Sequence, residues 1–257
     1  MPSAEHIRAQ TSGGVARLLL DQPSKLNALD HGMLLAIERL FAGWEGSDAL
    51  SVVVIGSTSA RAFCVGADLE VLSRMNEATM REWEMLGSRV LDRVQNSRLV
   101  SVAAIPGHAL GGGLTLAASC DFRMAAEDAT FAQPEIELGW IPGWCGVARL
   151  ARLAGPARAK ELCMTGRRIG AAEARSLGLA DEVVPGAALE ARAGEFAAQL
   201  AGRSREALAA IKSLSAALAP PAHPTAHRFD ALVNASLLKD PRGQAAIARF
   251  LSRKKEA

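Results

Sequence analysis

Residues 99–120, LVSVAAIPGHALGGGLTLAASC, decide the fold because they hold no charged side chain and still cannot form one continuous element. Residues 100–105 have the apolar pattern of a buried strand, and Pro106-Gly107 ends it. Gly111-Gly112-Gly113 then opens an apolar stretch that favours a buried helix. The glycines, the proline and His108 argue against a membrane-spanning helix, although the segment is long enough for one. The stretch therefore predicts a strand, a glycine turn and a helix in a globular core.

The rest of the chain continues this pattern outward from the central segment. Short apolar runs followed by turn residues predict further strands at residues 16–20, 51–55 and 121–125. Helical patterns are found at residues 70–98, 147–153, 157–164, 171–177 and 189–200. Strands therefore come first along the chain, and helices follow.

The tail holds the clearest amphipathic helix, after a proline-rich break at residues 220–224. One face of this helix carries Phe229, Leu232, Val233, Ser236 and Leu237. We expect this apolar stripe to be buried either on the main domain or across a subunit boundary.

Composition excludes several classes of protein. The chain has 257 residues, 49% of them hydrophobic and 22% charged, as in ordinary globular domains. Lys and Arg number 29 against 27 Asp and Glu, so neither nucleic acid nor a membrane surface is an expected partner. The four cysteines form no C-x-x-C pair, and residues 1–17 lack the apolar core of an export signal. These features favour the cytoplasm.

Two glycine-containing turns are the candidate sites for chemistry. They are residues 63–68, FCVGAD, and the glycine trio at residues 111–113, and each leads from a strand into a helix. The first N–H groups of a helix have no partner within the helix, so Gly66-Ala67 and Gly111-Gly112 could each direct one N–H at an oxyanion. The alternative is that both are only tight connections. Neither turn matches a nucleotide-binding glycine motif.

A set of motifs in a fixed order resembles the crotonase, or enoyl-CoA hydratase/isomerase, superfamily. The motifs are PSKLNAL (23–29), RAFCVGADL (61–69), GHALGGG (107–113), Cys120-Asp121, FAQPEIELGWIPG (131–143), LCMTG (162–166), AEA (172–174) and Val183-Val184. The resemblance implies an α/β fold in which residues 1–200 form a spiral of ββα units with two roughly perpendicular sheets. It implies that residues 201–257 form a C-terminal helical region for assembly into a homotrimer, or a hexamer of paired trimers.

The resemblance also implies a reaction on an acyl-CoA thioester. The N–H groups of Ala67 and Gly112 would stabilise an enolate, and Glu135 would act as acid and base. The family's hydratases use a second glutamate where this chain has Thr115, and a hydroxyl cannot act as a carboxylate does near neutral pH. Other members use an aspartate near Gly143 or a tyrosine, and this chain has no tyrosine. The expected activity is enoyl-CoA isomerase or hydratase; a hydratase-lyase, a hydrolase or a non-catalytic acyl-CoA-binding protein stays open.

Further substrate contacts are implied around these groups. They are Lys25, Leu26, Ala28, Arg61, Gly66, Asp68, Leu69, Gly111, Thr115, Pro134 and Trp144. Lys25 and Arg61 resemble positions near the phosphates of CoA, with a solvated surface residue as the alternative. Basic residues 253–255 have the same two interpretations.

Remaining candidates carry less weight. His108 is a weaker candidate base, and Cys145 is interpreted as a small buried hydrophobe. No metal and no separate cofactor are expected, because coenzyme A is part of the substrate.

Overall fold

The computed structural model describes residues 6–218 and 226–256, with side chains up to residue 217 and from 226 to 252. The expected break at residues 220–224 and the side chains of residues 253–255 lie outside this description.

The larger of two sheets has six strands in the order β1-β2-β3-β5-β7-β10. Its strands are β1 (Ile7–Ser12), β2 (Val15–Leu20), β3 (Val52–Ser57), β5 (Val100–Ile105), β7 (Phe122–Ala126) and β10 (Glu182–Val184). Only β1 and β2 are antiparallel, and Gly13 and Gly14 connect them with φ values of 57° and 82°. This positive-φ pair fits the tight hairpin turn that glycine favours.

The smaller sheet has four strands in the order β4-β6-β8-β9. Its strands are β4 (Ala62–Cys64), β6 (His108–Leu110), β8 (Thr130–Ala132) and β9 (Ile169–Gly170). The first three are parallel, and β9 is antiparallel to β8.

Helices connect the two sheets and cover their outer faces. The α-helices are α1 (His31–Glu45), α2 (Leu69–Leu72), α3 (Glu77–Asn96), α4 (Gly112–Ala118), α5 (Gly146–Ala154), α6 (Pro156–Thr165), α7 (Ala171–Ser176), α8 (Leu189–Ala201), α9 (Arg205–Leu218), α10 (Ala226–Leu237) and α11 (Pro241–Glu256). The 3₁₀ helices are η1 (Pro23–Lys25), η2 (Pro134–Leu138) and η3 (Gly186–Ala188).

The chain repeats one unit along its length: a strand of the large sheet, a strand of the small sheet, then helix. The units begin with β3 and β4, with β5 and β6, and with β7 and β8. This repeat is the spiral of ββα units, so the predicted fold class is confirmed. Because each unit crosses from one sheet to the other before its helix begins, the turns after the small-sheet strands lie side by side.

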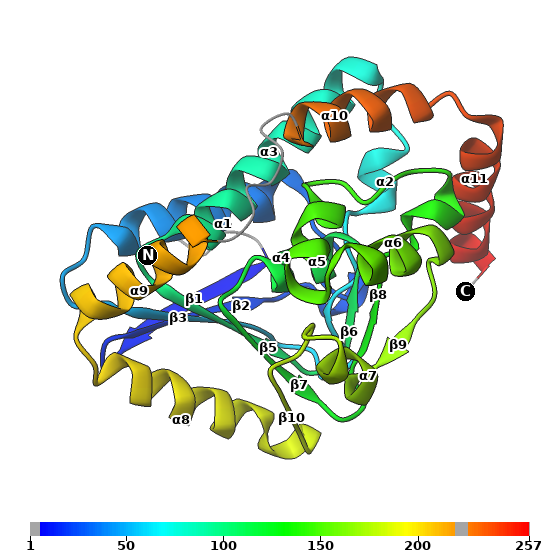
Figure 1. Cartoon of the computed structure of the whole chain (residues 1–257). Coiled ribbons are helices and arrows are strands. Elements are labelled where there is room, and N and C mark those ends of the chain that lie inside the picture. The colour runs from blue at the N-terminus through cyan, green and yellow to red at the C-terminus, as the bar shows by residue number, and fades with distance from the viewer. Residues whose placement is uncertain (1–5, 219–225, 257) are drawn as a thin grey trace.

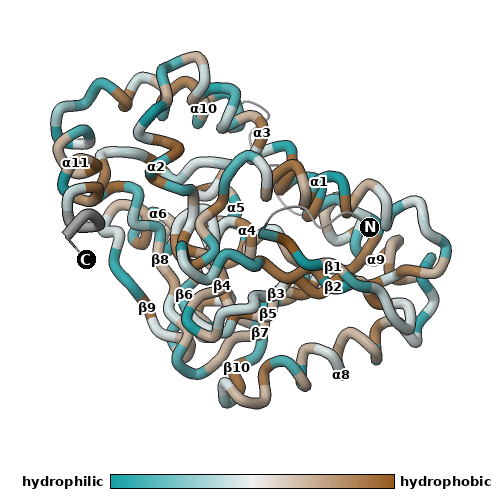
Figure 2. Tube along the Cα trace, turned by 180° about the vertical axis from the view of Figure 1, so that it is seen from behind, coloured by the Kyte–Doolittle hydropathy of each residue, from teal (hydrophilic) through white to brown (hydrophobic). Residues whose placement is uncertain are grey.

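The central strands of the large sheet are buried on both faces. On β3, Val53 and Ile55 point into the main core, while Val52 and Val54 point toward α8. This explains why the sequence shows continuous apolar runs rather than alternation. Figure 1 shows α8 along one face of this sheet, with α1 and α3 on the other side. Figure 2 shows the view from behind, with hydrophobic residues along the central strands.

The C-terminal helices pack onto the core through a face that the sequence did not indicate. Helix α10 lies along α3, and its buried residues include Asp230 and Asn234. Phe229 and Leu232, on the predicted apolar stripe, are each 61% exposed. The polar side chains face inward because they hydrogen-bond to the core: Asn234 Oδ1 accepts from Ile141 N at 3.2 Å. Among the described residues, Phe229 and Leu232 of the stripe therefore stay uncovered, while Val233 and Leu237 are half-buried.

None of the helices in the described residues combines the length and apolar character needed to cross a bilayer.

Candidate active site

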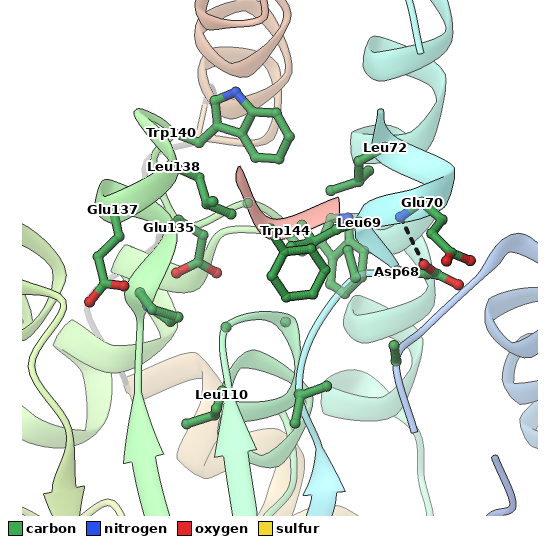
Figure 3. A pocket seen from close by; sticks show the side chains of 18 of the residues that line it. Asp68, Leu69, Glu70, Leu72, Leu110, Glu135, Glu137, Leu138, Trp140 and Trp144 are labelled. Carbon is green, nitrogen blue, oxygen red and sulfur yellow. Dashed lines mark hydrogen bonds between the residues drawn. The ribbon is translucent and has the colours of Figure 1, made fainter. Parts of the chain in front are cut away.

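A cavity of about 770 Å³ lies at the ends of the small-sheet strands. Its walls come from η1, the turn before α2, helix α3, the glycine turn before α4, η2, and the segment up to Trp144. Figure 3 shows Glu135, Leu138 and Trp140 on one side, Leu69 and Leu72 on the other, and Trp144 between them. The walls are mostly apolar, and carboxyl groups stand out among them.

The two glycine turns meet at the base of this cavity. Gly66 has a φ of 97°, and a Cβ atom there would lie 3.1 Å from Gly112 N and 3.1 Å from Leu110 O. Only glycine allows the two backbones to approach this closely. Among residues 6–218 and 226–256, the N–H groups of Ala67 and Gly112 have no hydrogen-bond acceptor. Both residues line the cavity.

Neighbouring backbone hydrogen bonds hold these turns in place. Leu29 N donates to Gly66 O at 2.7 Å, and Asp68 N donates to Leu29 O at 2.8 Å. In the second turn, Gly111 N donates to Ala132 O at 2.9 Å. The turns are thus tied to the segments on each side of the small sheet, which fixes where their N–H groups point.

Glu135 is the carboxyl closest to the glycine turn. It follows Pro134 at the start of η2, and a Cβ atom on Gly111 would lie 2.9 Å from its Oε1 atom. Burial raises the pKa of Glu135 to about 8, and the nearby charge of Glu84 adds to the shift. A carboxyl of this pKa can both accept and release a proton near neutral pH.

A buried amide connects Glu135 to Thr115. With the Gln133 amide oriented as its partners require, Nε2 lies 3.1 Å from both carboxyl oxygens of Glu135. Its Oε1 atom then accepts from Thr115 Oγ1 at 3.1 Å. Thr115 is fully buried behind Gly111 and does not line the cavity. Thr115 therefore reaches the cavity only indirectly, through Gln133 and Glu135 and through the carbonyl of Gly111, 3.2 Å from its hydroxyl.

The ammonium group of Lys25 is paired within the chain. Lys25 Nζ lies 2.5 Å from Asp68 Oδ2 and 2.9 Å from Glu70 Oε2. These hydrogen bonds raise the pKa of Lys25. Asp68 Oδ1 also accepts from Glu70 N at 2.9 Å, which caps α2. Asp68 and Lys25 therefore order this side of the cavity mouth.

Trp144 forms the wall above the glycine turn. A Cβ atom on Gly112 would lie 2.5 Å from its ring, and one on Gly87 of α3 would lie 2.1 Å from its Nε1 atom. The Trp83 and Trp144 ring centroids are 5.3 Å apart. The indole is thus held between two glycines and a second indole.

The structure brings most of the predicted site residues to one cavity. Those that line it are Lys25, Leu26, Ala28, Ala67, Asp68, Leu69, Gly111, Gly112, Pro134, Glu135 and Trp144. Gly66, Arg61 and Thr115 lie outside the lining. Gly66 shapes the turn from behind. Arg61 is exposed and directly precedes β4, and its carbonyl accepts a hydrogen bond from His108 N.

Sequence reasoning missed a second carboxyl of the same cavity, the buried Glu84 of α3. Its Oε2 atom accepts from Trp144 N at 3.0 Å, and its Oε1 atom accepts from Asn234 Nδ2 at 3.0 Å. Burial raises the pKa of Glu84 to about 7, and the charge of Asp230 adds to the shift. Glu84 belongs to an ordinary amphipathic helix, so no local motif marks it.

Other reactive side chains offer no further centre in the described part of the chain. No three His, Cys, Asp or Glu residues there are placed to hold a metal ion. The four cysteines are buried free thiols, and burial raises the pKa of each to about 12. His108 Nδ1 lies 2.7 Å from Thr130 Oγ1, and burial lowers the pKa of His108.

The ββα spiral, with its cavity beside two touching glycine turns, defines a crotonase-type α/β protein. Comparison with known proteins agrees with this class. The model of the enoyl-CoA hydratase/isomerase family matches residues 10–257. The chain therefore belongs to the enoyl-CoA hydratase/isomerase family, whose members are lyases or isomerases.

Individual relatives include proteins named for both activities. The chain is 37% identical over 180 residues to a crotonyl-CoA hydratase of Syntrophomonas wolfei, covering 70% of this chain and 69% of that one. It is 37% identical over 207 residues to an enoyl-CoA isomerase/hydratase of Mycosarcoma maydis, covering 77% and 76%. A crystal structure of an enoyl-CoA hydratase from Bacillus anthracis is similar with a TM-score of 0.81 and 33% identity, covering 98% and 96%.

Proposed function

We propose that this enzyme converts an enoyl-CoA ester by way of a thioester enolate, and that its main reaction is isomerisation of the double bond. One observation carries the proposal. The Glu135 carboxyl belongs to the same cavity as the N–H groups of Ala67 and Gly112, which find no acceptor among the described residues, and the two glycine turns touch.

The backbone donors would stabilise the charge that develops during the reaction. When a proton leaves the α carbon of the thioester, negative charge moves to the carbonyl oxygen. Two fixed N–H groups lower the energy of this enolate without reorganisation, and losing one such donor typically costs about 2.7–4 kcal/mol of transition-state stabilisation. This role fits the absence of other acceptors for the two N–H groups in the described residues.

Glu135 would move the proton. As a carboxylate it takes a proton from carbon 2 of a 3-enoyl ester, forming the enolate, and as a carboxylic acid it returns that proton to carbon 4. The double bond then lies between carbons 2 and 3, and the atoms and charges balance with no other reactant. A pKa of about 8 supports both steps, because the group is neither strongly acidic nor strongly basic.

Water addition is the second candidate, favoured by the relatives that are named as hydratases. Hydration profits from a second group that holds the water. Thr115 does not reach the cavity, so it cannot contact a water there directly. Isomerisation needs only one carboxyl, and we therefore expect isomerase activity to exceed hydratase activity.

The deciding experiment measures turnover and binding side by side. Spectrophotometric assays with 2-enoyl-CoA and 3-enoyl-CoA esters are run next to calorimetric titration with the same esters on the Glu135→Gln variant. We expect the wild type to turn over the 3-enoyl ester, and the Glu135→Gln variant to bind the esters without turning them over. Binding without turnover of either ester by the wild type would favour a non-catalytic acyl-CoA-binding protein. Cleavage of the thioester or of a carbon–carbon bond would instead indicate a hydrolase or a hydratase-lyase.

We also propose that the chain assembles into a homotrimer or hexamer in the cytoplasm. Ile211 and Leu214 of α9 are 62% and 64% exposed, and Phe229 and Leu232 of α10 are each 61% exposed, so these two helices of the C-terminal region present apolar side chains. Apolar surface of this kind marks an interface. The unpaired thiols suit a reducing compartment. A monomer in light scattering at micromolar concentration would contradict the assembly.

A further inference from the structure

The wall of the cavity contains an ionisable carboxyl, Glu84, with which an acyl group made only of hydrocarbon would form no hydrogen bond. Glu84 is only 5% exposed, and both of its hydrogen-bond partners are neutral donors, Trp144 N and Asn234 Nδ2. Among the described residues, no Lys, Arg or His forms an ion pair with it. A buried carboxylate without a neighbouring cation costs free energy unless other hydrogen-bond donors stabilise its charge.

The carboxyl stays open to the cavity because residue 143 is glycine. A Cβ atom on Gly143 would lie 2.5 Å from both carboxyl oxygens of Glu84. Gly143, Glu84 and Asn234 all line the cavity. Any larger side chain at position 143 would collide with the carboxyl or displace it, so the glycine preserves this polar part of the wall.

The titratable groups that face Glu84 are acidic, so they raise its pKa and supply no positive charge. Asp230 of α10 lies on the same side and accepts from Cys145 N at 2.7 Å. Glu135 of η2 is the other carboxyl whose charge couples to Glu84. The basic residues near Asp230 are His227 and Arg149, and both lie within ion-pair distance of Asp92 rather than Glu84.

Much of the cavity lining is apolar. The apolar side chains that share this lining with Glu84 include Leu72, Met80, Trp83, Trp140 and Ile141. An unsubstituted alkyl group would fill this space but place methylene groups against Glu84, which removes water from the carboxyl and offers no partner in return. Each Glu84 oxygen accepts one hydrogen bond from the protein, and an acyl group with a hydrogen-bond donor would add a further one.

We propose that Glu84, with Asn234 beside it, selects acyl groups that carry a hydrogen-bond donor beyond the reacting carbons, either a hydroxyl or a primary ammonium group. The proposal rests on the proposed function, because it takes the cavity as the acyl pocket. Glu84 is here a specificity-determining residue, while Glu135 remains the acid and base.

The two donors make different demands on Glu84. An ammonium group needs the ionised carboxylate, whereas a hydroxyl can donate to the carboxylate or accept from the protonated acid. With a pKa of about 7, both forms of Glu84 are present near neutral pH. Esters that carry an amino group or a hydroxyl group therefore show whether the pocket prefers a cationic or a neutral acyl group.

The test measures binding of unreactive esters, so that it does not depend on turnover. Isothermal titration calorimetry compares hexanoyl-CoA, ω-hydroxyhexanoyl-CoA and ω-aminohexanoyl-CoA, and then the octanoyl series, on the wild type and on Glu84→Gln. Glu82→Gln is the matched control, because Glu82 is an exposed residue of the same helix that does not line the cavity. Thermal unfolding checks that each variant is folded.

We expect the wild type and Glu82→Gln to bind a hydroxyl or amino ester about tenfold more tightly than the alkyl ester in at least one series. Glu84→Gln should lose the amino preference and bind hydroxyl and alkyl esters within about threefold of each other. A larger preference for the amino ester assigns a cationic acyl group, and a larger preference for the hydroxyl ester assigns a neutral one.

Three results would overturn the proposal. The first is a wild type that binds alkyl esters as tightly as the substituted ones, which decides the question even if Glu84→Gln does not fold. The second is a Glu84→Gln variant that weakens all esters by one common factor, which would make Glu84 only a support for the Trp144 segment. The third, no binding of any CoA ester, would overturn the proposed function as well and is thereby distinguished from the other two.

Discussion

The half-buried Glu135 and the buried Glu84 are carboxyls of one cavity, but they are held there in opposite ways. Glu135 lies on a short 3₁₀ helix, and Gln133, two residues before it, contacts both of its oxygens. Glu84 lies within a 20-residue helix, and its partners are 60 and 150 residues away along the chain. The first carboxyl is positioned by its own motif, and the second by the packing of α3, α10 and the segment before α5.

This difference matches the two roles that we propose, proton transfer for Glu135 and selection of the acyl group for Glu84. The motif around Glu135 places it against the glycine turn, where a thioester would react. The tertiary contacts of Glu84 place it in a separate part of the wall, in contact with Gly143 and Asn234. The same Glu→Gln substitution at each position can therefore show whether the two carboxyls have different roles.

The largest effect is expected from Glu135→Gln. The amide keeps the shape but cannot accept a proton, so kcat should fall by about 10³-fold while ester binding stays close to that of the wild type. Steady-state assays and calorimetry measure the two quantities, and Glu127→Gln, at an exposed position, is the control. A near-normal kcat of the Glu135→Gln variant would show that Glu135 is not the base, and would contradict the proposed difference between Glu135 and Glu84.

Gly143→Ala tests whether the open wall depends on glycine. Because the new Cβ atom would lie 2.5 Å from both Glu84 oxygens, we expect the free energy of unfolding to fall by about 1–3 kcal/mol. Gly43→Ala on α1 is the control, since a Cβ atom there meets nothing within 4 Å.

A double-mutant cycle sharpens this result in chemical denaturation. If the collision is with Glu84, the loss caused by Gly143→Ala should shrink in a Glu84→Ala background. Additive losses would show that Gly143 is needed for another reason.

Thr115→Ala should have a modest effect. Thr115 acts on Glu135 only through Gln133, and loss of one such hydrogen bond should lower kcat by about 2- to 10-fold. Thr115→Ser retains the hydroxyl and should restore the rate. A loss as large as that of Glu135→Gln would mean that the threonine takes part in the chemistry directly.

The smallest effect is a shift in the pH profile. If Glu135 must be ionised to take the proton, kcat/KM rises with pH and reaches half its maximum near pH 8. Glu84 raises the pKa of Glu135 by repulsion, so Glu84→Gln should move this midpoint to lower pH by less than about 1 unit. A midpoint that stays fixed or moves upward would show that the two carboxyls are not coupled.

The sequence by itself indicated the buried strands and the two glycine turns, and the resemblance of its motifs to the crotonase superfamily implied the spiral fold and the main parts of the candidate site. Continuous apolar runs such as residues 100–105 predicted strands buried on both faces, and the structure has β5 at Val100–Ile105. The glycines at 66 and 111–112 predicted two turns that the structure brings into contact. These features depend on local chemistry, because a positive φ or a close backbone approach restricts the residue type wherever it occurs.

Only the tertiary structure decided what faces the rest of the cavity. Thr115, two residues after the glycine trio, turns out to lie behind Gly111, and Lys25 is paired with Asp68 and Glu70. Glu84 and Asn234 carry no motif, and Phe229 and Leu232 of the tail stripe that periodicity selected are exposed. A helical pattern predicts that one face is buried, but a polar face can replace an apolar one when each polar group finds a partner on another element. Those partners are set by how distant helices pack, which no window of the sequence contains.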